Sequence, residues 1–103
     1  MKTEEFMIEV ENGHNRSKRL LIKKADEYSG EEDRLEHFYR AGAAQWINPA
    51  EALIGMATKH FTSIADMVKD PTAYSIKKWN GKLTDLRNYT HLLDALVRDM
   101  GAK

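Results

Sequence analysis

The sequence predicts an all-α fold, a single-domain bundle of about four helices. Apolar residues recur at helical spacing in four successive segments, and no segment shows the sustained alternation of apolar and polar residues that is typical of a strand. The only two prolines, Pro49 and Pro71, lie between these segments. A chain of 103 residues suits one domain, and we expect association of several copies to enlarge its modest core.

The first helix is expected over about residues 3–28. Gly13, His14 and Ser17 lie in the middle of its apolar stripe, where packing alone would favour leucine or alanine. Gly13 can also mark a simple kink. The other members of the stripe follow helical spacing and are Phe6, Val10, Leu21, Ala25 and Tyr28.

The second helix is expected over about residues 31–45. Ser29 can cap its first turn and Glu32 can reach back to the cap three residues later, which is the arrangement of a capping box. We expect its inward face to contain Leu35, Phe38, Tyr39, Gly42, Ala43 and Trp46.

The third helix is expected to begin at Asn48 and Pro49, since asparagine caps a helix and proline suits its first turn. It should end before Pro71. Its stripe contains Leu53, Met56, Ala57, His60, Phe61, Ile64, Met67 and Val68. The last helix is expected over about residues 76–100, with Gly101 as its terminator. Its inward residues are Trp79, Leu83, Leu86, Tyr89, Leu93, Leu96 and Val97.

The composition of the chain argues against several classes of function. Sixteen Lys and Arg residues balance sixteen Asp and Glu residues, so the chain lacks the net basic field by which proteins bind duplex DNA. The absence of cysteine excludes disulfides, thiolate metal sites and cysteine nucleophiles. We find neither a signal peptide nor an apolar run long enough for a membrane span, and therefore expect a cytoplasmic protein with no membrane partner.

Six polar residues occupy the predicted apolar stripes: His14, Ser17, Lys24, His60, Lys82 and Asp85. Burial of the stripes against one another would bring cations, neutral donors and a carboxylate toward one region of the bundle, which suits a small anionic ligand. Together with polar neighbours on the same helices, these positions give the predicted ligand-binding residues, which are Lys24, Tyr28, Lys59, His60, Lys82, Asp85 and Asn88.

Structural roles are open for the same residues. His60 can be a core histidine bonded to a carbonyl or a carboxylate. Lys82 and Asp85 are three residues apart and can form an internal ion pair, or Lys82 can extend to solvent near the start of its helix. Asp85 is too short to reach solvent in that way, so it is either a site residue or a buried structural group.

Acidic residues crowd the junction of the first two helices: Asp26, Glu27, Glu31, Glu32, Asp33 and Glu36. Carboxylates at helical spacing are the ligands of magnesium-dependent phosphate chemistry, although such a run also suits a solvated helix start. The four histidines include no His-x-x-x-His pair, so a zinc site is not indicated.

Several segments together form a pattern that extends over most of the chain. They are Lys24-Ala25-Asp26-Glu27-Tyr28 with Asp33 after it, Phe38, Asn48-Pro49, Lys59-His60 with Ser63-Ile64, and Lys82 to Tyr89 with Leu92-Leu93. In these segments the chain resembles a group of short hypothetical proteins of bacteriophages. The Asp-x-x-Asn-Tyr-x-x-Leu-Leu pattern that begins at Asp85 is also distantly similar to the last helix of MazG-like all-α nucleotide pyrophosphohydrolases.

The chain departs from these hydrolases at the residues that would bind metal. Their pattern is Glu-Glu-x-x-Glu on one helix and Glu-x-x-Asp on the next. Here Glu32 is followed three residues later by Leu35 and then by Glu36, and Lys82 stands three before Asp85 where the resemblance implies a glutamate. A cation at that position favours phosphate over a metal ion.

We therefore expect a homo-oligomeric phage-type protein that works without a cofactor in the host cytoplasm. It would bind or sequester a phosphorylated nucleotide, such as a host defence signal, without turning it over. A magnesium-dependent nucleotide pyrophosphohydrolase is the alternative, and its metal ligands would be Glu31, Glu32, Glu36 and Asp85. A protein-interaction module, in which the polar stripe residues only set helix register, is a further alternative.

Overall fold

The computed structural model of the chain describes residues 1–27 and 33–103. These residues form four α-helices and no strand, which confirms the predicted all-α fold. A single 3₁₀ turn joins the last two helices. In chain order the elements are α1 (Thr3–Glu27), α2 (Glu36–Gln45), α3 (Pro49–Met67), η1 (Pro71–Ala73) and α4 (Ile76–Asp99).

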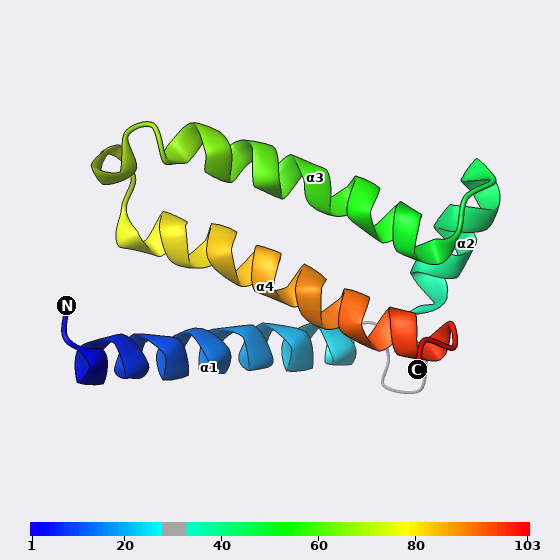
Figure 1. Cartoon of the computed structure of the whole chain (residues 1–103), viewed down its shortest axis with the longest axis horizontal. Helices are drawn as coiled ribbons and strands as arrows, with labels where there is room; N and C mark the ends of the chain where they lie inside the picture. The colour runs from blue at the N-terminus through cyan, green and yellow to red at the C-terminus, as the bar shows by residue number, and fades with distance from the viewer. Residues whose placement is uncertain (28–32) are drawn as a thin grey trace.

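The three long helices lie lengthwise beside one another, with α4 between α1 and α3 (Figure 1). Helices α1 and α4 run in the same direction, whereas α3 runs against them. The short helix α2 crosses one end of this layer and packs on α3. None of the helices in the described ranges is both long and apolar enough to cross a membrane.

Side-chain caps hold the starts of α3 and α4, which lie where the sequence predicts them; the cap of α3 was also predicted. The Asn48 side chain accepts a hydrogen bond from the Glu51 amide (2.9 Å), and the Asn48 amide donates to the Glu51 carboxylate (3.2 Å), which completes a capping box. Ser75 caps α4 by accepting from the Lys78 amide at 3.1 Å. Gly101 follows α4 with a φ of 103°, a left-handed conformation that favours glycine.

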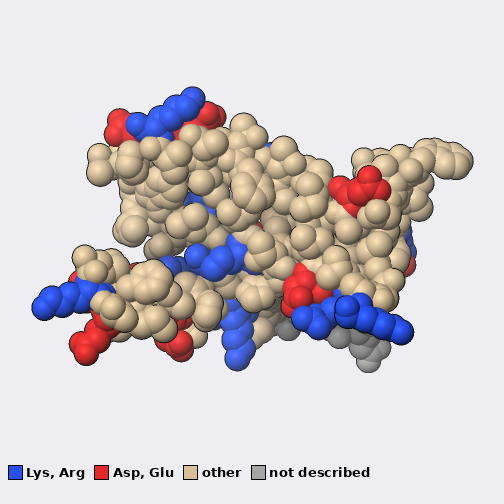
Figure 2. Space-filling model, viewed as in Figure 1, with Lys and Arg blue, Asp and Glu red and all other residues tan. Residues whose placement is uncertain are grey.

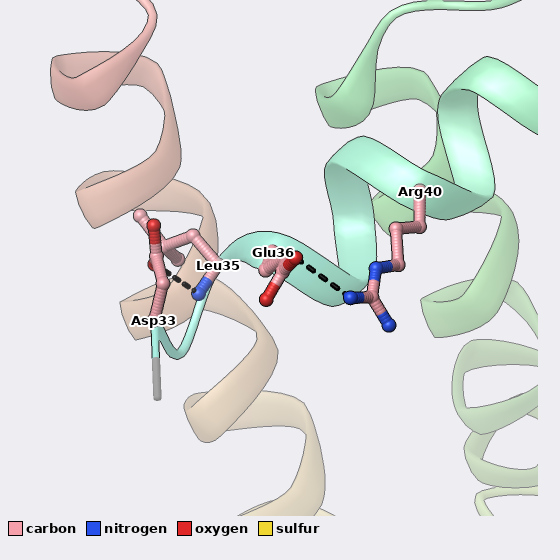
Figure 3. Close-up of polar contacts among 4 residues, drawn as sticks. All are labelled: Asp33, Leu35, Glu36 and Arg40. Atoms are coloured by element: carbon pink, nitrogen blue, oxygen red, sulfur yellow. Dashed lines mark hydrogen bonds and ion pairs between the residues drawn. The ribbon is translucent and has the colours of Figure 1, made fainter. Parts of the chain in front are cut away.

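Helix α2 begins at Glu36, later than the predicted start at residue 31. The Asp33 carboxylate accepts a hydrogen bond from the Leu35 amide at 2.8 Å, and residues 34–35 form a turn (Figure 3). Aspartate favours such turns because its short side chain bonds the backbone two residues on. The predicted cap at Ser29 lies outside the described residues.

The core is small and lies where α2, α3 and α4 meet. Its buried apolar side chains are Phe38, Leu53 and Leu96, and partly buried neighbours pack around them: Leu35, Ala50, Met56, Tyr89, Leu92 and Leu93. Four residues of the predicted stripes are more than half exposed instead, namely Phe6, Trp46, Phe61 and Val68. Trp46 leaves the stripe because α2 has already ended there in a left-handed turn, with a φ of 60°.

A polar contact joins α1 to α4 and explains two of the unexpected residues on the first stripe. Arg87 donates from Nε to the Ser17 hydroxyl (3.0 Å) and from Nη2 to the Thr84 hydroxyl (3.1 Å). Gly13 is buried beneath the guanidinium, and a Cβ there would lie 3.3 Å from Arg87 Cζ. Burial, together with the positive charge of Arg16, lowers the pKa of Arg87. Gly13 and Ser17 therefore make room for an arginine and bond it.

Gly42 packs directly on the α2–α3 connection, where a Cβ would lie 2.8 Å from the carbonyl oxygen of Ile47. Because that oxygen belongs to the backbone, it cannot rotate away. We expect Gly42→Ala to lower the free energy of unfolding by about 1–3 kcal/mol. Gly55→Ala is the matched control, since a Cβ at Gly55 meets nothing within 4 Å. It should raise stability by about 0.5–1 kcal/mol. Urea unfolding measures both changes, and equal stabilities of the two variants would contradict this account.

Candidate functional site

One cleft of about 650 Å³ lies among the end of α1, the turn before α2, and the middle of α3 and α4. Five of the seven predicted ligand-binding residues line it: Lys24, Lys59, His60, Asp85 and Asn88. Side chains from three helices that are distant in sequence therefore meet at one place. Apolar side chains complete the walls, namely Leu20, Leu21, Phe38, Met56 and Leu92. We call this space the four-helix cleft.

The other two predicted residues are placed differently. Tyr28 lies outside the described residues. Lys82 is half-buried on α4 but does not line the four-helix cleft, and the ion pairs of the described residues do not include the expected one between Lys82 and Asp85. Asp85 lies opposite His60 instead. His14, the remaining stripe residue, lines a separate smaller depression with Lys18, Leu21 and His91.

His60 lies between an acidic and an aromatic neighbour. Its Nδ1 is 3.9 Å from Asp85 Oδ2, which is too long for a hydrogen bond. The imidazole also packs on the Tyr89 ring, with ring centroids 5.2 Å apart and planes tilted by 44°. Burial, and then the charge of Asp85, raise the pKa of Tyr89. The Tyr89 phenol therefore stays protonated near neutral pH and can donate a hydrogen bond.

Two buried polar atoms in this cleft have no hydrogen-bond partner within the described part of the chain. They are His60 Nδ1 and Asn88 Oδ1. The Asn88 side chain comes from a residue that is 7% exposed, so little water reaches it from outside the cleft. Leaving such an atom unpaired costs about 1–3 kcal/mol, and buried polar groups in folded proteins almost always have partners. Both atoms lie within the walls of the four-helix cleft with less than 1 Å² exposed each, so a ligand would reach them only after a side chain rotates.

Some of the basic residues that line the cleft have protein partners and others do not. Arg40 pairs with Glu36 at 2.8 Å (Figure 3), and Arg34 donates from Nη1 to the Leu21 carbonyl at 3.1 Å. Lys24 and Lys59, by contrast, form no ion pair with any residue in ranges 1–24 and 33–103, where side chains are described. Their ammonium groups are therefore available to an anion that enters the cleft.

Sequence reasoning missed four polar residues of the cleft: Arg34, His37, Arg40 and Tyr89. Tyr89 follows Asn88 and lies one helical turn after Asp85, so the spacing could have included it. The other three come from the turn before α2 and from α2 itself. No signal was available for them because their inclusion depends on where α2 begins.

Two acidic residues of the alternative metal site, Glu36 and Asp85, line the four-helix cleft. Glu31 and Glu32 lie outside the described residues. Within the described ranges, no group of three or more histidine or acidic side chains is placed to hold a metal ion.

Comparison of the chain with protein-family models, with curated proteins and with solved structures finds no match. The interpretation of the cleft therefore depends on its own geometry and chemistry.

Proposed function

We propose that this protein binds a phosphorylated nucleotide in the four-helix cleft and releases it unchanged. In this proposal it belongs to the phage-type proteins that its sequence resembles, and it sequesters a nucleotide signal of host defence. Two observations carry the proposal. Within ranges 1–24 and 33–103, two buried polar atoms in the walls of the cleft have no hydrogen-bond partner, and the two lysines that line it form no ion pair.

The chemistry of a nucleotide matches this arrangement in two parts. Lys24 and Lys59 offer ammonium groups to phosphate oxygens, which form strong charge-assisted hydrogen bonds. His60, Asn88 and Tyr89 offer hydrogen-bonding groups and ring faces to a base, whose edge carries both donors and acceptors. The volume of about 650 Å³ lies within the range of small-molecule sites.

The double variant Lys24→Ala/Lys59→Ala tests the proposal. We expect it to weaken nucleotide binding about 100-fold, because two charge-assisted contacts to phosphate are lost. Isothermal titration with ATP, with a cyclic dinucleotide and with pyrophosphate measures the change. Chromatography of the recovered nucleotide should show it intact.

Lys82→Ala is the matched control, since Lys82 is a lysine on α4 that does not line the cleft. It should bind as the wild type does. If no nucleotide binds the wild type, or if Lys82→Ala weakens binding as much as the double variant, the proposal is wrong.

A magnesium-dependent nucleotide pyrophosphohydrolase is the second candidate, because Glu36 and Asp85 line the same cleft. In this case Glu31 and Glu32 would complete the metal ligands. Pyrophosphate release from a nucleoside triphosphate should then require Mg²⁺ and disappear in Asp85→Asn. The same titrations distinguish the two candidates, since an enzyme returns altered nucleotide.

A further inference from the structure

The outward face of α1 carries a regular row of exposed residues. Ile22 is nine positions from Gly13, and at about 100° per residue this places it on the side of α1 opposite the contact with α4. Ile8 and Ile22 on this face are 60% and 54% exposed. Positions separated alternately by four and three residues share one side of a helix. The row, which we call the outer row, is Glu4, Ile8, Glu11, Asn15, Lys18 and Ile22, with Lys18 at its edge, since Lys18 also lines the small depression that includes His91 of α4.

Charge divides α1 into two halves. The half before Asn12 is rich in acidic residues, which are Glu4, Glu5, Glu9 and Glu11. The half after Asn15 is rich in basic residues, which are Arg16, Lys18, Arg19, Lys23 and Lys24, and it ends in the acidic pair Asp26 and Glu27. Acidic and basic side chains both stand out along α1 in Figure 2. The outer-row charges Glu4, Glu11 and Lys18 form no ion pair with another residue in ranges 1–24 and 33–103.

We propose that the outer row of α1 binds the same row of a second copy, with the two helices antiparallel and a twofold axis near Asn15. This register places Ile8 level with Ile22 of the second copy. Glu11 then lies beside Lys18 and Arg19 of the second copy, and the twofold axis repeats each contact. A parallel pairing would instead bring acid to acid and base to base, which is unfavourable.

We identify the partner of the outer row as a second copy of this chain, because the surface of α1 is self-complementary. A twofold interface needs one surface that fits itself, and α1 carries an acidic half, a basic half and an isoleucine in each. The small core provides a second reason, because none of the apolar side chains of α1 over residues 3–24 is buried in the single chain, and Val10, Leu20 and Leu21 are only partly buried. Helices gain most of their stability from packing an apolar face, so an isolated outer row leaves α1 weakly held.

Charge reversal provides the first test. In Glu11→Lys, residue 11 repels the two basic residues opposite it, and in Lys18→Glu/Arg19→Glu those positions repel Glu11. We expect each variant alone to associate about tenfold more weakly than the wild type, because attractive pairs become repulsive at both twofold-related sites. An equimolar mixture of the two variants should regain the association, since every pair is again of opposite sign. Sedimentation velocity over a concentration series measures this.

Glu9→Lys is the matched control, because it makes the same charge change on α1 outside the outer row. It should associate as the wild type does. Failure of the mixed variants to associate, or equal weakening by Glu9→Lys, would overturn the proposed pairing. A wild type that stays monomeric at all concentrations would overturn it as well.

A single cysteine tests the register, since the chain has no cysteine of its own. Asn15→Cys lies at the twofold axis, where two copies bring their residue 15 together, and mild oxidation should yield a disulfide-linked dimer. Thr62→Cys, exposed on α3, should remain unlinked under the same conditions. Equal cross-linking of the two variants would contradict the register. Lys24, the α1 residue of the four-helix cleft, is absent from the outer row, so these outcomes do not depend on nucleotide binding.

Discussion

Leu96→Ala is expected to lower the free energy of unfolding by about 2–5 kcal/mol. Leu96 is fully buried and packs with Phe38 and Leu53 in a core that has few other apolar members. Truncation removes buried methyl groups and leaves a cavity that the surrounding helices fill only in part. Small domains are stable by about 5–15 kcal/mol, so this one change would remove a large share of the stability.

Urea unfolding followed by circular dichroism at 222 nm, where helices give a strong signal, checks this expectation. The dependence of the free energy of unfolding on urea concentration should stay about the same in the variant and the wild type. Ile54→Ala is the control, because Ile54 is 51% exposed on α3 and its truncation removes little buried surface. We expect its effect to stay within about 0.5 kcal/mol. If Ile54→Ala destabilised the chain as much as Leu96→Ala, the core would not lie where α2, α3 and α4 meet.

Asn88→Leu is expected to raise the stability of the fold and to weaken ligand binding. The Asn88 Oδ1 atom is buried without a partner in the described chain, so an apolar side chain of similar volume should raise the free energy of unfolding by about 1 kcal/mol. The same change removes a polar group from the four-helix cleft. Loss of a hydrogen bond to a ligand weakens binding by about tenfold.

Thr84→Val provides the matched comparison on the same helix. Thr84 is buried as Asn88 is, but its hydroxyl accepts a hydrogen bond from Arg87. We expect Thr84→Val to lower stability by about 1 kcal/mol and to reduce nucleotide affinity less than Asn88→Leu does, because Thr84 does not line the cleft. Thermal unfolding and isothermal titration on both variants give the two readouts. A stability loss in Asn88→Leu without a change in affinity would make Asn88 a structural residue and not a binding one.

The helices were predictable because their signals are local. The Asn48 cap, the proline that follows it and the glycine after α4 each act within a few residues, and the structure confirms the boundaries that they predict. The start of α2 was wrong by about five residues, because Asp33 forms a turn with the Leu35 amide. Aspartate side chains can bond a backbone amide two residues on in place of a helical turn, and the sequence does not show where this happens.

The site was predictable only in part. His60 and Asp85 stood out as polar groups on apolar stripes, and Asn88 as a polar neighbour on the same helix as Asp85; the structure brings all three to one cleft. Lys82 satisfied the same criterion and lies elsewhere, since a long side chain on a stripe can turn away from the core. The role of Arg87 could not be predicted from the sequence. Arg87 bonds Ser17 between α4 and α1, and the sequence pattern does not show that these two helices are neighbours.

The way α1 is attached affects the four-helix cleft. Arg87 bonds Ser17 across the α1–α4 contact, whereas the apolar core lies among the other three helices. Undocking of α1 would thus disrupt little of that core, yet it would carry Lys24 away from Lys59. The affinity observed for a ligand held by both lysines is the intrinsic affinity multiplied by the fraction of molecules with α1 in place. Strengthening the contact beneath Arg87 would then tighten binding from a distance, with no change to any side chain that touches the ligand.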